Sequence, residues 1–74
     1  MERILLKEAV GKRLKECRLQ AGLTQKQVAD KLGVAQPVYQ RFEKGLYECG
    51  YEHLAALCRI FDVSADYLLG ISEY

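Results

Sequence analysis

The sequence predicts a single small all-α domain. Apolar residues recur three and four positions apart along the whole chain, and no segment alternates apolar and polar residues as a strand does. Glycines and capping residues divide this pattern into five short segments. The 74 residues, 50% of them apolar and 28% charged, suit one soluble globular domain, residues 1–74, with an N-terminal extension of about residues 1–6.

The first predicted helix runs from about Leu6 to Ala21. Its apolar stripe has helical spacing and faces away from lysines and arginines; the stripe consists of Leu6, Val10, Leu14 and Cys17. Gly11 weakens this helix by about 1 kcal/mol relative to alanine. Gly22 is placed to end the helix in the left-handed conformation.

A pair of helices with a tight turn follows, at about residues 24–43. Thr24 and Gln27 have the spacing of a capping box, and Gly33 closes this helix after about two turns. The next helix spans about Gln36 to Glu43, with Pro37 in its first turn, where no backbone donor is needed. Ala35 is a poor cap because it has no side-chain oxygen.

Two more helices complete the fold. Residues 44–50 are predicted to form a loop, and the pattern then indicates a helix from about Tyr51 to Phe61. Ser64 is a suitable cap for a short helix, Ala65 to Leu69, which Gly70 ends.

Composition argues against several classes of protein. No apolar run approaches the roughly 20 residues that cross a bilayer, and the N-terminus is too short and too charged for a signal peptide, so we expect a cytoplasmic protein. Three widely spaced cysteines and one histidine, His53, suit neither a disulfide framework nor a metal site; Cys17 and Cys58 are predicted core residues. The sequence contains no recognisable nucleophile–base pair, carboxylate cluster or phosphate-binding glycine loop. We therefore expect neither an enzyme nor a bound cofactor.

Charge is distributed unevenly although the net charge is only +1. Residues 1–31 carry a net charge of +4 and residues 32–74 a net charge of −3. Such a distribution can give a nearly neutral molecule a basic face, as nucleic-acid binding requires, although an ordinary solvated surface explains it equally well.

The third predicted helix has one apolar and one polar side. Val34, Tyr39 and Phe42 are predicted to point inward. The opposite side then exposes four candidate base-contacting residues, Gln36, Pro37, Gln40 and Arg41. A helix in the DNA major groove contacts base edges with its first turns; glutamine suits adenine, and arginine suits guanine.

From about Gly11 to Gly70 the sequence resembles the phage-repressor and Cro-type helix-turn-helix regulators, often called XRE-type. The residues that carry the resemblance are Arg18, Gly22–Gln25, Val28–Ala29, Leu32–Val34, Gln36, Arg41–Gly45, Leu54–Leu57 and Val63–Ser64. The resemblance implies a compact five-helix, lambda-repressor-like DNA-binding domain. Ala35 departs from the family, which usually has a serine or threonine cap there, and Cys49-Gly50 replaces a frequent proline.

The resemblance also implies roles for single residues. Gln25 would lie near a DNA phosphate and near Gln36, and Lys44 and the loop after it would contact backbone phosphates. We add Lys26 as a further candidate for phosphate contact. Arg18 and Glu43 match positions that form a structural ion pair in this family.

The C-terminal end carries more apolar residues than a short last helix needs. These residues are Tyr67, Leu68, Leu69, Ile71 and Tyr74. We expect part of this end to form a homodimer interface, which would place two recognition helices about 34 Å apart along the DNA.

The predicted function is sequence-specific binding to double-stranded DNA by a transcriptional regulator, a repressor that occupies an operator as a homodimer. The alternative is an antitoxin-like or phage-encoded protein-interaction module with secondary DNA binding. A neighbouring toxin gene, or a protein complex that survives salt when DNA binding does not, would favour that alternative.

Overall fold

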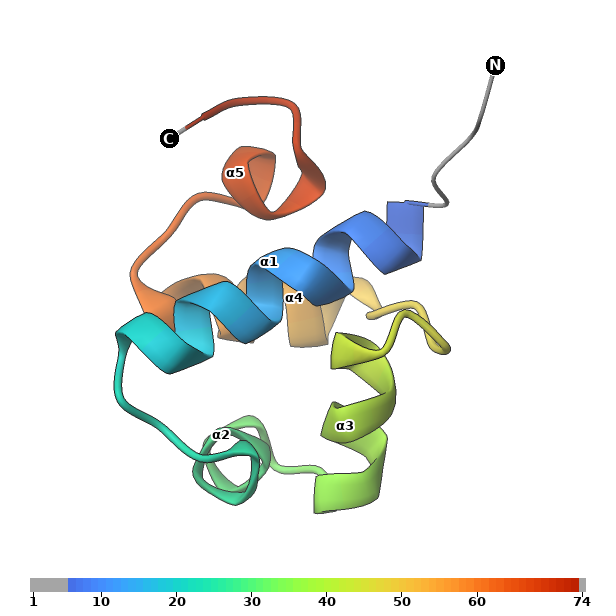
Figure 1. Ribbon diagram of the computed structural model, residues 1–74, viewed down its shortest axis with the longest axis vertical. Coiled ribbons are helices and arrows are strands. Elements are labelled where there is room, and N and C mark those ends of the chain that lie inside the picture. Colours follow the sequence, from blue (N-terminus) through green and yellow to red (C-terminus); the bar gives the residue numbers. More distant parts are fainter. Residues whose placement is uncertain (1–5, 74) are drawn as a thin grey trace.

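The computed structural model describes residues 6–73, and this part of the chain consists of helices and connecting loops without a strand. The helices are α1 (Leu6–Gln20), α2 (Gln25–Leu32), α3 (Gln36–Glu43), α4 (Tyr51–Phe61) and α5 (Ala65–Leu69). In Figure 1, α1 crosses the middle of the molecule, α4 lies behind it, α5 lies above it, and α2 and α3 lie below. The predicted five-helix all-α fold is confirmed.

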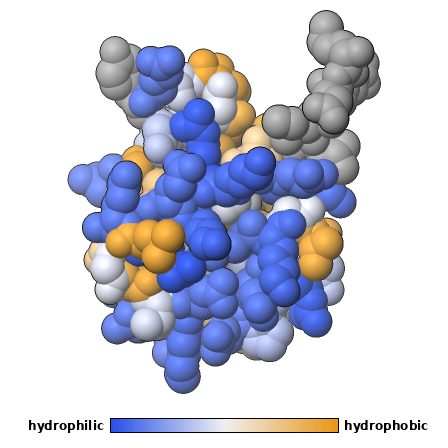
Figure 2. Space-filling model, viewed as in Figure 1, coloured by the Kyte–Doolittle hydropathy of each residue, from blue (hydrophilic) through white to orange (hydrophobic). Residues whose placement is uncertain are grey.

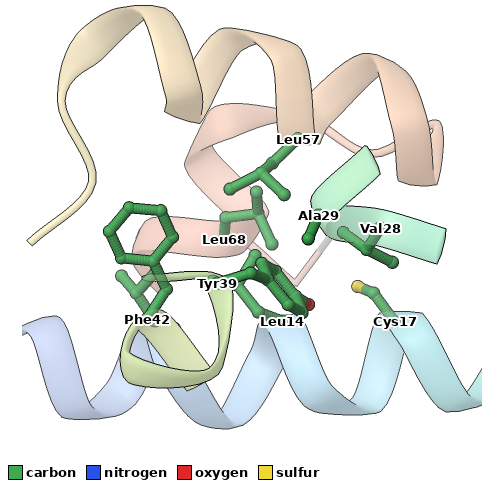
Figure 3. Close-up of a cluster of buried hydrophobic side chains, with 9 residues drawn as sticks. Leu14, Cys17, Val28, Ala29, Tyr39, Phe42, Leu57 and Leu68 are labelled. Atoms are coloured by element: carbon green, nitrogen blue, oxygen red, sulfur yellow. The ribbon is translucent and has the colours of Figure 1, made fainter. Parts of the chain in front are cut away.

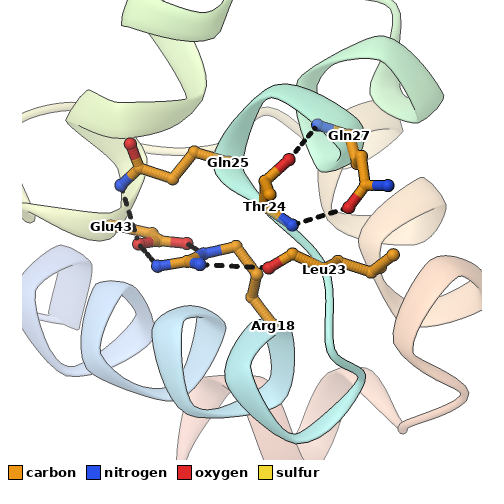
Figure 4. Close-up of polar contacts among 6 residues, drawn as sticks. All are labelled: Arg18, Leu23, Thr24, Gln25, Gln27 and Glu43. Atoms are coloured by element: carbon orange, nitrogen blue, oxygen red, sulfur yellow. Dashed lines mark hydrogen bonds and ion pairs between the residues drawn. The ribbon is translucent and has the colours of Figure 1, made fainter.

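Local sequence signals set the ends of these helices. Gly22 and Gly33 have φ values of +70° and +81°, the left-handed conformation that ends α1 and α2. At the start of α2, Thr24 Oγ1 accepts from the Gln27 amide at 3.1 Å, and the Thr24 amide donates to Gln27 Oε1 at 2.8 Å (Figure 4). Ala35 gives α3 no side-chain cap. The order of caps and glycines produces the helix-turn-helix pair.

Each helix contributes at least one fully buried side chain to a common core. The largest from each helix belong to Leu14, Val28, Tyr39, Leu57 and Leu68, and they meet at the centre of the domain (Figure 3). Phe42 is also buried, and Val34 is half-buried against the core, as predicted. Because the core draws on all five helices, no helix pair can bury its apolar face alone.

The cysteines are free thiols within the described structure. Cys17 is buried in the core and Cys58 packs against it, as predicted. Cys49 lies half-buried after α3, and its burial raises the pKa of the thiol to about 11. This thiol is therefore protonated and weakly nucleophilic at neutral pH.

The C-terminal end mainly closes the core. We expected Leu68 at a dimer interface, but this expectation was wrong. Leu68 is fully buried in the core, so it has no surface with which to contact a partner subunit. Tyr67 is half-buried, and the centroid of its ring lies 4.5 Å from the guanidinium carbon of Arg13 in α1. Ile71 remains 73% exposed. Tyr74 lies outside the described residues.

At Gly11, α1 and α3 come into backbone contact. A Cβ atom on this residue would lie 2.5 Å from the carbonyl oxygen of Glu43 and 2.6 Å from that of Phe42. The sequence indicated only a weak point in α1 here. The structure shows why a residue without a side chain is needed, since any larger one would push the end of α3 away.

An ion pair joins α1 to the last turn of α3. Arg18 donates through Nε to Glu43 Oε2 at 2.6 Å and through Nη2 to Oε1 at 3.2 Å, which is the pairing that the family resemblance implies (Figure 4). Arg18 Nη1 also donates to the carbonyl of Leu23 at 3.1 Å. The side chain of Glu43 is only 3% exposed, so its charge depends on these donors.

Burial and hydrogen bonding act on Glu43 in opposite directions. Burial alone would raise the pKa of the carboxyl group, but the donors from Arg18 and Gln25 stabilise the charged form. The net result is a pKa below the ordinary value of 4.5. The buried hydroxyl of Tyr39 lies near this carboxylate but outside hydrogen-bond geometry.

We predict that Gly11→Ala destabilises the domain by about 2 kcal/mol or more, because backbone carbonyls cannot make room for the added methyl group. Alanine's higher helix propensity, worth about 1 kcal/mol, offsets this cost only partly. Gly50→Ala is the control: Gly50 has φ of −68° and no atom within 4 Å of an added Cβ. Equal free energies of unfolding for the two variants would contradict the prediction.

Arg18→Ala is expected to lower the free energy of unfolding by about 3 kcal/mol, because it leaves the buried carboxylate of Glu43 without its main partner. Lys26→Ala, which breaks the exposed Lys26–Asp30 pair, should cost less than about 0.5 kcal/mol. Both values can be measured by urea denaturation at neutral pH.

The same pair predicts an acid-sensitive component of stability. The pKa of Glu43 is lowered by folding, so its contribution is complete above the ordinary value of 4.5 and is lost as the pH falls through the folded-state pKa. Glu43→Gln should remove that component from the dependence of unfolding on pH. An unchanged acid dependence in this variant would show that other carboxyl groups cause it.

Candidate nucleic-acid interface

The outer side of α3 carries the residues predicted to contact bases. Successive helical residues are about 100° apart, so positions 36, 37, 40 and 41 share an arc opposite the buried Tyr39 and Phe42. Gln36, Pro37 and Arg41 are exposed, whereas Gln40 is half-buried. The anchoring of the inner side in the core therefore fixes which side chains α3 presents to solvent.

The two helices of the pair are steeply inclined to one another. In Figure 1, α2 is seen nearly end-on while α3 runs in the plane of the view. Gly33 in the left-handed conformation makes the sharp change of direction, and its amide donates to the carbonyl of Ala29 at 2.9 Å. Ala29 itself is buried, as a small residue between packed helices.

The candidate phosphate-contacting residues lie at the ends of these helices. Lys44 is exposed and caps the end of α3. Lys26 is exposed in the first turn of α2, where its ammonium group lies 3.2 Å from the Asp30 carboxylate. The first amides of α2, at Gln25 and Lys26, precede the helix's own hydrogen-bond ladder and so stay available to an acceptor.

Gln25 has a partner that the sequence did not indicate. Its side-chain amide donates to Glu43 Oε1 at 3.1 Å, across the helix pair (Figure 4). Gln25 therefore links α2 to α3 in the free protein. The spacing of 18 residues between the two gives no signal of this contact, because it depends on the angle between the helices.

The contact between Tyr47 and Arg41 is a second feature that the sequence did not indicate. The Arg41 guanidinium carbon lies 5.4 Å from the centroid of the Tyr47 ring, within the range of a cation–π contact. The contact exists because Gly45, at φ +72°, turns the chain back along the end of α3. An aromatic residue in a loop gives no sequence signal of this kind.

The surface around α2 and α3 is mostly hydrophilic. Figure 2 shows hydrophilic residues over most of the visible face, with apolar residues in separate small patches. Within residues 6–73, no set of three or more His, Cys, Asp or Glu side chains is grouped so that it could hold a metal ion. None of the described helices has the length and apolar character needed to cross a membrane.

Comparison with known proteins agrees with this geometry. The family model described as helix-turn-helix matches residues 14–68. The HTH-type transcriptional regulator YqaE of Bacillus subtilis (strain 168) is 50% identical over 56 residues, which are 76% of this chain and 48% of that protein. ImmR, an HTH-type transcriptional regulator of the same organism, is 40% identical over 65 residues, covering 88% of this chain and 51% of ImmR.

A solved structure gives the same fold. The clp gene regulator ClgR of Corynebacterium glutamicum superposes with a TM-score of 0.86 at 29% sequence identity, over 92% of this chain and 72% of that one. The present chain spans about half the length of YqaE and ImmR. The match to the family model and the identity to these regulators show that the chain belongs to the XRE-type helix-turn-helix family of transcriptional regulators.

Proposed function

We propose that this protein represses transcription by binding an operator through the major groove. In this proposal α3 enters the groove, and Gln36, Gln40 and Arg41 form hydrogen bonds with base edges, while Pro37 offers an apolar contact to a thymine methyl group. Helix α2 lies across the backbone, with its first amides near a phosphate. Bound at a promoter, the domain would block polymerase.

The observation that carries the proposal is the division of α3 into two sides. Its inner side is fixed by Tyr39, Phe42 and the paired Glu43, and its outer side holds exposed polar side chains. A rigid helix with exposed amide and guanidinium groups suits base recognition, which needs donors at fixed positions.

Backbone contacts would supply most of the affinity. Lys26 and Lys44 are exposed at the ends of α2 and α3, as phosphate contacts require. Gln25 would reach a phosphate only by giving up or sharing its hydrogen bond with Glu43. The two lysines are therefore the stronger candidates for the phosphate contacts.

Binding as a homodimer is part of the proposal. Of the residues expected at the dimer interface, Ile71 is 73% exposed, and Tyr67 is half-buried beside Arg13. We assign the centre of the interface to Ile71. Two-fold symmetry would then present two recognition helices to half-sites about 34 Å apart.

Selection of bound sequences from random duplex DNA at about 150 mM salt tests the proposal, and we expect a palindromic consensus. Arg41→Ala should relax the preference at one base pair of each half-site by about 1–3 kcal/mol. Lys44→Ala should instead weaken binding to all sequences and lower the salt slope by about one. Parental behaviour of both variants would show that this face does not contact DNA.

Sedimentation equilibrium of the chain, with and without DNA, tests the dimer. Ile71→Lys is expected to raise the dimer dissociation constant at least about tenfold, because burying an isoleucine contributes roughly 1.5–3 kcal/mol. Tyr51→Lys is the matched control, since Tyr51 is 93% exposed at the start of α4. A chain that stays monomeric at high micromolar concentration on DNA would refute the homodimer, and a stronger effect of Tyr51→Lys would move the interface to α4.

A further inference from the structure

We propose that Tyr47 is a positioning residue that sets how sharply Arg41 discriminates between bases. The inference rests on the proposed function, because it concerns the base contact of Arg41. In it, the Tyr47 ring holds the guanidinium of Arg41 in place before DNA arrives and makes no base contact itself.

The geometry of the Arg41 side chain supports this role. The guanidinium carbon lies 5.4 Å from the centroid of the Tyr47 ring. Within residues 6–73, Arg41 makes no side-chain hydrogen bond or ion pair, in contrast to Arg18. A guanidinium that packs against an aromatic ring keeps its N–H groups available, and these groups are the donors that guanine or phosphate accepts.

The loop that carries Tyr47 is attached to Arg41 by the backbone as well. The amides of Leu46 and Tyr47 both point to the carbonyl oxygen of Arg41, at 3.0 and 3.4 Å. The backbone that carries the ring is therefore fixed relative to Arg41.

Gly45 holds the start of this loop against α1. It is buried and has φ of +72°, and a Cβ atom on it would lie 2.7 Å from the Cα atom of Glu8. The loop is thus held between α1 and the end of α3. A ring supported in this way restricts the long Arg41 side chain more than a ring on a free loop would.

Restricting the rotamers of Arg41 before DNA binds should sharpen its discrimination between bases. An arginine with many accessible rotamers loses conformational freedom when it contacts a base, and it can also reach neighbouring acceptors. With its guanidinium held beside the Tyr47 ring, Arg41 has fewer alternative partners. Loss of the ring should therefore cost specificity at the base pair that Arg41 contacts, and little elsewhere.

Tyr47 has 46% of its surface exposed, so its hydroxyl could instead serve as a phosphate donor. Tyr47→Phe separates the two roles, because it keeps the ring and removes the hydroxyl. Tyr51→Ala, at a tyrosine that is 93% exposed, is the matched control for loss of an exposed aromatic side chain.

The test combines selection from random duplex DNA with NMR of the free protein. We expect Tyr47→Ala to reduce discrimination about two- to five-fold at the base pair that Arg41→Ala relaxes, the size expected for an exposed cation–π contact. Tyr47→Phe and Tyr51→Ala should behave as the parent, and adding Tyr47→Ala to Arg41→Ala should cost nothing further. In the free protein, the Arg41 Nε–H signal should carry a ring-current shift that Tyr47→Ala removes and Tyr47→Phe keeps.

Three results would overturn the inference, and they separate it from the proposed function. If Arg41→Ala relaxes one base pair and Tyr47→Ala does not, the positioning role fails and the proposed function stands. If Tyr47→Ala and Tyr47→Phe weaken all sequences alike, the hydroxyl contacts the backbone instead. If the parent selects no consensus, the proposed function fails and the inference fails with it, even with the ring-current shift present.

Discussion

A buried carboxylate needs hydrogen-bond donors to stay charged, and the donors to Glu43 come from two other helices. Arg18 of α1 donates two hydrogen bonds to it, and Gln25 of α2 donates a third. Glu43 is the last residue of α3, so these bonds connect the end of α3 to both α1 and α2. The orientation of the helix-turn-helix pair therefore depends on one buried charge, which is costly to bury and even more costly to leave without a partner.

The apolar core holds the same arrangement from inside. At least one fully buried side chain from each of the five helices lies at the centre, with Tyr39 of α3 the largest of them. No pair of helices can bury its apolar residues without the others. The orientation of the polar outer side of α3 therefore depends on the folding of the whole domain. The exposed residues of α3 can accordingly be exchanged without disturbing the core or the ion pair, since neither uses them.

Most of the fold could be predicted from the sequence because its signals are local. The Thr24–Gln27 capping box and Gly22, Gly33 and Gly70 act within a few residues, so the helix ends agree closely with expectation. What could not be predicted depends on how helices pack. An excess of apolar residues near the C-terminus suggested an interface, yet Leu68 closes the core. The contacts Gln25–Glu43 and Arg41–Tyr47 depend on the helix angle and on the path of a loop, which spacing does not encode.

The backbone contact at Gly11 limits how far the angle between α1 and α3 can change. Where two helices are separated by side chains, substitutions at the contact can tilt one against the other and so move a recognition helix in its groove. Here α1 meets the carbonyls of Phe42 and Glu43 directly, and no side chain stands between them to be exchanged. Under the proposed function, a new DNA preference would therefore arise by replacing side chains on the outer side of α3 and not by altering its angle to α1.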